Sequence, residues 1–252
     1  MALGYSSQAG GGFAGVGWGL TGFSVIQRVS PGLGTPHYDS TDVFVLNGLE
    51  LIACQSPRCT TGGTHATKVE SYLRISLAGN SWTVVGKDGT RITLTPVFTT
   101  SAGTLAWGQT SVVDTHGNTA TYAWGCDTAL CDSGDFYPDS VTFGPYSVKL
   151  YRETRPDVMS AATGSASALR WTRFRLRSIL VNYQASSIRA YKLTYTTSPV
   201  NGRSLLASVQ QYGKDVAIDS SGTITGGTSL PARLFQYQND PGAGVFQLHF
   251  PQ

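Results

Sequence analysis

Short apolar or alternating runs, each closed by Gly, Asn or Asp, recur along the whole chain. The clearest pair is residues 42–46 and 49–52, because Asn47-Gly48 between two apolar runs is typical of a hairpin turn with positive φ at both positions. Helical spacing of apolar residues is hard to find anywhere. Further strands are predicted at residues 71–77, 81–85, 90–94, 107–113, 119–124, 140–143, 147–153, 171–181, 188–194, 205–211 and 234–237.

The pattern predicts an all-β fold with antiparallel sheets built from consecutive hairpins and meanders, either sandwich-like or part of a β shell. We expect a single domain over residues 1–252, with a break at residues 125–139 as the place for any subdivision. Residues 156–168 and 213–229 have no strand pattern and are predicted to be loops. The second segment is rich in Gly, Ser and Thr, which is typical of disorder.

The first 28 residues combine dense glycines with regularly spaced large apolar side chains. Glycines this dense usually mark a flexible linker, but a linker would not carry Phe13, Val16, Trp18, Leu20 and Phe23 at near-regular spacing. We therefore expect a tight turn and a strand in which glycine lets another backbone or a large ring approach closely.

Composition supports β structure and gives little support for nucleic-acid binding. Charged residues make up 13% of the 252 residues and aromatic residues 11%, against roughly 25% charged residues in an average soluble domain. The net charge of +3 is too small to indicate a nucleic-acid partner. The sequence contains neither an apolar run long enough for a transmembrane helix nor a visible signal peptide, so we expect an excised domain or another export route.

The four cysteines form two pairs with equal spacing, Cys54 with Cys59 and Cys126 with Cys131. Two local disulfides would suit an extracellular protein. Free thiols and a four-thiolate zinc site are the alternatives, although Pro57, Asp127 and Asp132 are unlike the usual short zinc knuckle.

Seven motifs in sequence order resemble the N-terminal domain of the plasmid-virulence B protein (SpvB-type) family, which also opens the B subunits of insecticidal toxin complexes, relatives of the Rhs/YD-repeat shell proteins. The opening motif is carried by Leu3, Tyr5-Ser6-Ser7, Gly15, Gly17-Trp18, Leu20, Gly22, Ser24, Ile26 and Arg28. The others lie at residues 42–52, 82–89, 107–122, 155–157, 189–195 and 230–237. Asn47, Ala232 and the two cysteine loops depart from the family pattern.

The resemblance implies a non-catalytic structural domain of a secreted, extracellular bacterial toxin or Rhs-like assembly, which contributes to a shell around a toxic cargo. Its expected partners are the remainder of the shell or other toxin-complex subunits. The resemblance implies no cofactor and no catalytic residue, because the enzymatic activity of the relatives lies in other regions.

Arginines at alternate positions of one predicted strand are the densest charge feature. Arg173, Arg175 and Arg177 would share one face, with Phe174 and Leu176 on the other. With Trp171 and Tyr183 nearby in sequence, they suggest a site for an anionic polysaccharide, a phosphate backbone or an acidic partner. Charges that protect an exposed edge or face of the sheet from unwanted pairing are the alternative.

The remaining polar residues give weaker signals. No histidine (His37, His65, His116, His249) lies within four residues of another, so no local metal site is expected. Asp88, Asp114, Asn118 and Asp157 lie beside Gly or Pro and are predicted to cap turns. Tyr191, Leu193 and Tyr195, and likewise Trp18, Trp82, Trp107 and Trp124, are predicted core residues. A carbohydrate-binding module and, less strongly, a polysaccharide-cleaving enzyme that uses Tyr with Arg or His remain the alternative functions.

Overall fold

The computed structural model describes residues 1–55, 59, 62–126, 135–165 and 169–237. Every secondary-structure element in these ranges is a β-strand, so the predicted all-β fold is confirmed. A helix long and apolar enough to span a bilayer is absent from the described part of the chain.

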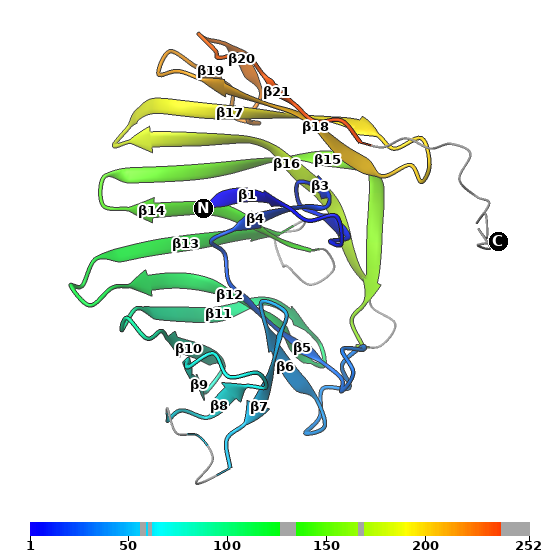
Figure 1. Cartoon of the computed structure of the whole chain (residues 1–252), viewed down its shortest axis with the longest axis vertical. Coiled ribbons are helices and arrows are strands. Elements are labelled where there is room, and N and C mark those ends of the chain that lie inside the picture. The colour runs from blue at the N-terminus through cyan, green and yellow to red at the C-terminus, as the bar shows by residue number, and fades with distance from the viewer. Residues whose placement is uncertain (56–58, 60–61, 127–134, 166–168, 238–252) are drawn as a thin grey trace, which may run out of the picture.

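Most strands belong to one antiparallel sheet of 15 strands (Figure 1). Its strands are β5 (Val25–Val29), β6 (Val43–Leu46), β7 (Leu49–Ala53), β8 (His65–Thr67), β9 (Arg74–Ala78), β10 (Ser81–Val85), β11 (Arg91–Thr100), β12 (Gly103–Val113), β13 (Thr119–Cys126), β14 (Phe136–Phe143), β15 (Tyr146–Ala162), β16 (Leu169–Tyr183), β17 (Ser186–Thr197), β18 (Ser204–Tyr212) and β21 (Arg233–Leu234).

The sheet closes on itself at one end and stays open at the other. Strand β11 pairs with β12, which also pairs with β5, so strands β5 to β12 form a closed ring. Residues 106–108 of β12 pair with β5, whereas residues 111–113 pair with β13. The sheet therefore leaves the ring at β12 and continues as an open sheet from β13 to β21, which rises above the ring in Figure 1.

Two main cores stabilise these two parts. Inside the ring, Ile26, Ile75, Trp82, Leu94 and Trp107 are buried to 2% exposure or less. On the open sheet, Leu150, Leu176, Leu193 and Leu206 form a second cluster beneath the N-terminal segment. Tyr191 and Tyr195 pack against this second cluster, which confirms the predicted core stripe on β17.

The N-terminal segment folds into four short strands that cover the open sheet. These are β1 (Ala2–Tyr5), β2 (Gly11–Gly12), β3 (Gly15–Val16) and β4 (Trp18–Thr21), with β1 paired to β4 and β2 to β3. Leu3, Phe13, Trp18 and Leu20 pack against the cluster on the open sheet.

The predicted close backbone approach occurs at Gly15. Its φ is +97°, and a β-carbon there would lie 2.9 Å from the carbonyl oxygen of Ser204. Only glycine fits this contact without displacing β18, so the glycine-rich opening is a packed element rather than a linker.

The predicted hairpin at Asn47-Gly48 is confirmed, with φ values of 49° and 90° between β6 and β7. The loop prediction for residues 156–168 is wrong over residues 156–162. Strand β15 continues through Pro156 to Ala162. Residues 155–158 form a bulge opposite β16, and pairing resumes beyond the bulge, with Met159 opposite Thr172. These small and polar residues do not alternate with apolar ones, so no strand pattern is visible there.

Residues 213–229 were predicted to be a disordered loop, and this is also wrong. They contain the hairpin β19 (Ala217–Ile218) and β20 (Ile224–Gly226), whose Ile224 packs on Leu180 and Ala190 of the open sheet. Asp219 accepts hydrogen bonds from the backbone N–H groups of Ser221 and Thr223, so the polar residues close a turn.

Candidate functional site

Arg173, Arg175 and Arg177 lie at alternate positions of β16, and Glu153 of β15 forms ion pairs with the last two. The Arg175 Nε donates to Glu153 Oε1 at 2.7 Å, and the Arg177 Nε lies 3.9 Å from Glu153 Oε2. The Arg173 guanidinium lies over the Trp171 ring, 5.5 Å from its centroid. The polysaccharide-binding role of Arg173, Arg175 and Arg177 stays a prediction.

Tyr183 lies away from these arginines. It is six residues beyond Arg177 on the same strand, and a strand rises about 3.3 Å per residue. Its ring instead packs against Tyr146 of β15, with 5.2 Å between ring centroids. The structure therefore brings Trp171 and the arginines together but separates Tyr183 from them.

A buried ion pair adjoins the arginines and was not predicted. Arg155 donates from Nε and Nη2 to the two carboxylate oxygens of Asp157, at 3.0 and 2.9 Å, and both side chains are almost fully buried. Arg155 Nη1 also donates to the carbonyl oxygen of Gly12. The prediction that Asp157 caps a turn is wrong, because its carboxylate binds the Arg155 side chain of the same strand and Ser204 of β18.

Ser204 joins this ion pair to the arginines of β16. Its backbone N–H and its hydroxyl both donate to Asp157, and its hydroxyl oxygen accepts a hydrogen bond from Arg175 at 2.8 Å. Burial would raise the pKa of Asp157, but the hydrogen bonds from Arg155 and Ser204 outweigh it and hold that pKa well below its ordinary value. The network thus joins the N-terminal segment, β15, β16 and β18.

Tyr195, beside this network, is poorly suited to act as a catalytic base. Tyr195 lies beside Arg175, 4.2 Å from ring centroid to guanidinium, as a base in a polysaccharide-cleaving site would. Burial, however, raises the pKa of Tyr195 far above its ordinary value, and its hydroxyl donates to the carbonyl oxygen of Leu176. A protonated phenol already committed as a donor cannot accept a substrate proton at neutral pH.

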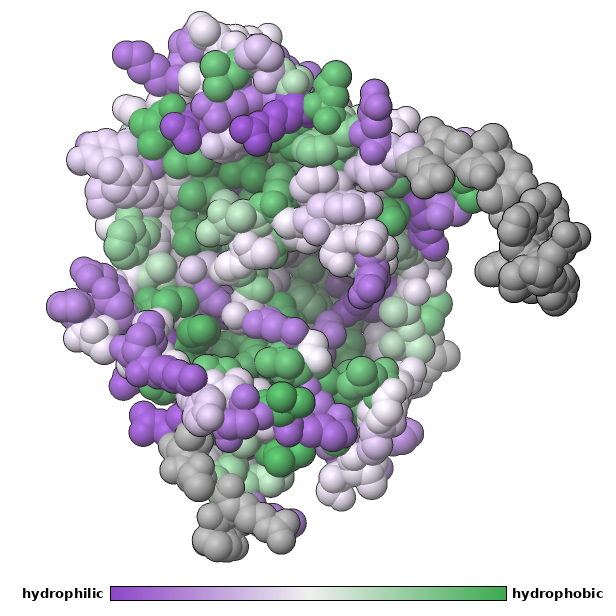
Figure 2. All heavy atoms as spheres, in the orientation of Figure 1, coloured by the Kyte–Doolittle hydropathy of each residue, from purple (hydrophilic) through white to green (hydrophobic). Residues whose placement is uncertain are grey.

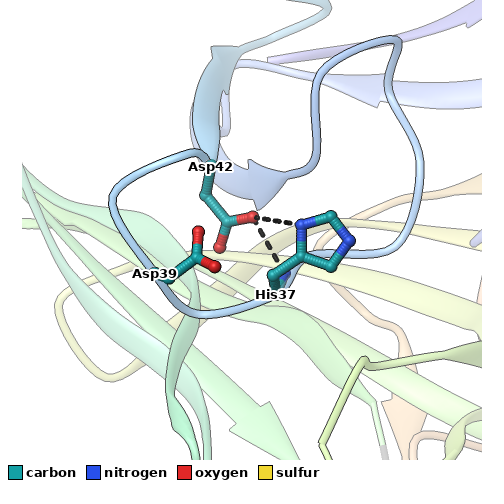
Figure 3. A group of neighbouring side chains, drawn as sticks. All are labelled: His37, Asp39 and Asp42. Carbon is teal, nitrogen blue, oxygen red and sulfur yellow. Dashed lines mark hydrogen bonds and ion pairs between the residues drawn. The ribbon is translucent and has the colours of Figure 1, made fainter.

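His37, Asp39 and Asp42 gather in the loop before β6 (Figure 3). The buried Asp42 carboxylate accepts from the backbone N–H groups of His37 and Tyr38, at 2.8 and 2.7 Å, and from Arg28 at 3.4 Å. The Arg28 guanidinium opposes binding of a cation at the same oxygens. The hydrogen bonds to Asp42 therefore stabilise the conformation of the loop before β6.

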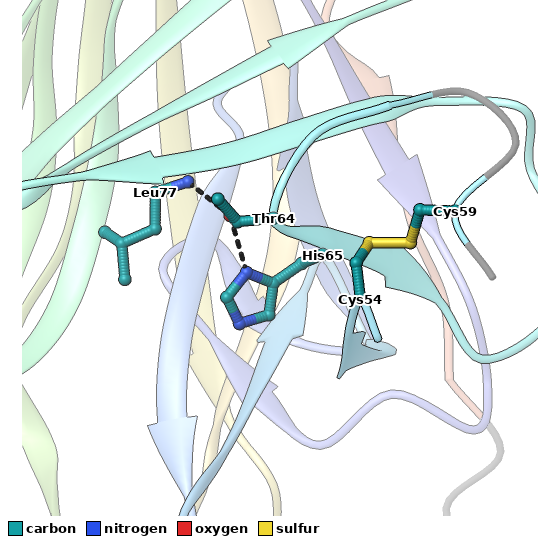
Figure 4. The surroundings of a disulfide bond; sticks show 5 residues. All are labelled: Cys54, Cys59, Thr64, His65 and Leu77. Carbon is teal, nitrogen blue, oxygen red and sulfur yellow. Dashed lines mark hydrogen bonds between the residues drawn. A yellow bond between two sulfur atoms is a disulfide. The ribbon is translucent and has the colours of Figure 1, made fainter. Parts of the chain in front are cut away.

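Of the two predicted cysteine pairs, the structure describes one completely. Cys54 and Cys59 form a disulfide that closes the loop after β7 (Figure 4). Cys126 is also disulfide-bonded, while Cys131 and His249 lie outside the described residues.

The predicted turn caps are confirmed at two sites. Asp114 accepts from the backbone N–H groups of His116 and Asn118, and Asp88 accepts from that of Thr90.

His65 lies at the edge of the ring core rather than in solvent. Its ring packs against Phe44 and Trp82, and its Nδ1 lies 2.9 Å from the Thr64 hydroxyl (Figure 4). Burial lowers the pKa of His65 below its ordinary value of 6.5.

The stability of the domain should fall as pH drops through about 6.5, because the unfolded chain then binds a proton that folded His65 resists. Urea unfolding at several pH values between about 7.5 and 5.5 measures this dependence. The His65→Phe variant should show a flatter dependence, whereas His116→Phe, in an exposed turn, should keep the wild-type slope. Equal slopes in wild type and His65→Phe would contradict the assignment.

Comparison with known proteins confirms the resemblance found in the sequence. The family model described as "Salmonella virulence plasmid 65kDa B protein" matches residues 1–67. The N-terminal domain of the effector protein SpvB from Salmonella typhimurium strain LT2 has a TM-score of 0.69 at 16% identity, over 84% of this chain and 92% of that one. No curated protein sequence matches the chain.

Two toxin-complex structures share the fold over nearly the whole chain. A chain of the Photorhabdus luminescens Tc holotoxin pore has a TM-score of 0.72 at 18% identity, over 94% of this chain. A chain of the TcdB2-TccC3 structure has a TM-score of 0.70 at 19% identity, also over 94% of this chain. The present chain spans only 14% and 15% of those two chains.

Proposed function

We propose that the chain is a non-catalytic structural domain of a secreted bacterial toxin complex and forms part of the wall of a shell around a toxic cargo. The observation that carries this proposal is the shared fold, over 94% of the chain, with a chain of the Photorhabdus luminescens Tc holotoxin pore. The proposed partners are the rest of the shell or other subunits of such a complex.

The edge of the sheet at β21, where no further described strand pairs, supports a structural role. Strand β11, at one end of the strand order, pairs with β12 and is therefore not an edge strand. Strand β21, at the other end, is the edge strand of the open sheet. Phe235 donates its backbone N–H to Ala207, and Arg233 pairs with Val209, so the intervening Leu234 turns its backbone N–H and carbonyl away from β18. An edge with outward-facing backbone groups is a template for a further strand.

Electron microscopy of the protein purified from its source organism tests the proposal. We expect a hollow particle in which residues 1–252 form one segment of the wall and a further strand pairs with the outer side of β21. A Leu234→Pro variant removes the outward N–H and should reduce assembly while the domain still folds; Leu234→Ala is the matched control. A solid particle, or a β21 edge left open to solvent, would refute the shell role.

The non-catalytic part of the proposal has its own test. Incubated with a panel of charged and neutral polysaccharides, the purified protein should release neither reducing nor unsaturated ends. Turnover that is lost in Arg175→Ala would overturn it.

A further inference from the structure

An apolar groove of about 510 Å³ lies between the N-terminal hairpin and the open sheet. Its walls include Leu3 and Leu20 of the hairpin and Val148, Val181 and Val209 of the sheet, and none of its lining side chains carries a charge. Figure 2 shows hydrophobic side chains exposed across the hollowed face on which β1 and β4 lie.

Exposed aromatic side chains continue the groove toward the tips of β14, β15 and β16. Phe143 is paired with Tyr146, and Tyr146 with Tyr183, and these side chains are 51%, 46% and 42% exposed. Because side chains alternate along a strand, Tyr146 and Tyr183 project from the same face as Val148 and Val181. The apolar surface therefore extends across three neighbouring strands beyond the groove.

Arg189 supplies a cation at the rim of this surface. It is the cross-strand neighbour of Val181, and its Nη1 lies 3.3 Å from the hydroxyl of Tyr191, a lining residue of the groove. The side chain is exposed, and no carboxylate among the described residues forms an ion pair with it. The groove thus combines apolar walls with a guanidinium available to a ligand.

We propose that this surface binds an extended polypeptide segment of a partner protein, with apolar side chains in the groove and a carboxylate against Arg189. A polypeptide is favoured because exposed Tyr and Phe, a Met and an Arg, with Asp, Glu and Lys absent from the lining, are the composition of a protein-interface centre. The carboxylate follows from the charge of Arg189. This inference does not depend on the shell role.

Fluorescence polarisation with three short labelled peptides tests the proposal. The first peptide alternates Leu and Ser and ends in Asp; in the second, Lys replaces the Asp; in the third, Ser replaces every Leu. We expect saturable binding of the first peptide, binding of the second weaker by about tenfold, and no binding of the third.

Variants of exposed residues locate the binding. Arg189→Gln should weaken binding of the Asp peptide by about three- to tenfold and remove the preference over the Lys peptide. Tyr183→Ala should weaken binding of both Leu peptides by about tenfold. Arg74→Gln and Tyr72→Ala, exposed residues near β9 in the ring, are matched controls that should bind as wild type does.

Three results would overturn the proposal. The first is a lack of saturable binding by the Asp peptide, and the second is wild-type binding by both Arg189→Gln and Tyr183→Ala. The third is a concentration-dependent dimer of the free protein that Tyr183→Ala abolishes, because the groove would then belong to a second copy of the chain.

Discussion

Replacing Arg155 with leucine should lower the free energy of unfolding by about 3–5 kcal/mol. The substitution leaves the Asp157 carboxylate buried with only Ser204 as its partner. A buried charge that loses its counter-ion keeps its desolvation cost without the attraction that offset it. Urea unfolding at neutral pH, followed by circular dichroism, measures the change.

Two further variants show whether the buried charge causes the loss. The double variant Arg155→Leu/Asp157→Leu removes both charges and should recover part of the stability. Lys68→Ala breaks the exposed pair between Lys68 and Glu50, whose side chains are 63% and 29% exposed, and should cost about 0–1 kcal/mol. If Arg155→Leu cost no more than Lys68→Ala, the ion pair would have no special role.

Acid should weaken the same contact at much lower pH than it affects His65. The pKa of Asp157 is held below its ordinary value in the folded state, so its contribution is present above the unfolded value of 3.8 and is lost as pH falls below it. The two acid-dependent losses therefore occur in separate pH ranges.

Replacing Trp107 with alanine should also cost about 3–5 kcal/mol. Trp107 is 2% exposed, its ring packs against Trp82 and Phe44, and its Nε1 donates to the carbonyl and side-chain oxygens of Asn80. Because the surrounding strands form a closed ring, the walls cannot easily collapse into the cavity.

The same unfolding assay measures this loss. Trp107→Phe keeps most of the ring contacts and should cost less, and Trp171→Ala, at a partly exposed position of β16, should cost less again. A Trp107→Ala variant as stable as Trp171→Ala would contradict the assignment of Trp107 to the centre of the ring core.

Local features were predictable because their cause lies within a few residues. The Asn47-Gly48 hairpin and the turn at Asp114 follow from residues that favour positive φ or bond to nearby backbone. Ring closure was not predictable, because the pairing of β5 with β12 joins residues about 80 positions apart and has no local signal.

The candidate site was only partly predictable for the same reason. Alternation correctly placed Arg175 and Arg177 beside each other, but Glu153 meets them through the register of β15 with β16, which a bulge sets. Arg155 and Asp157 were visible as a motif, yet their burial depends on Gly12 and Ser204 from distant segments.

Among the described strands, β12 connects the ring to the open sheet. One half of its edge holds β5 of the ring, and the other half holds β13, the first strand of the open sheet. A force applied at β21 is therefore transmitted into the ring through the backbone hydrogen bonds between successive strands. Because the ring is closed, its eight strands share that force. Unfolding of the ring would leave β13 paired only with β14 and would remove its partner β12, so we expect the two parts to unfold in one cooperative step.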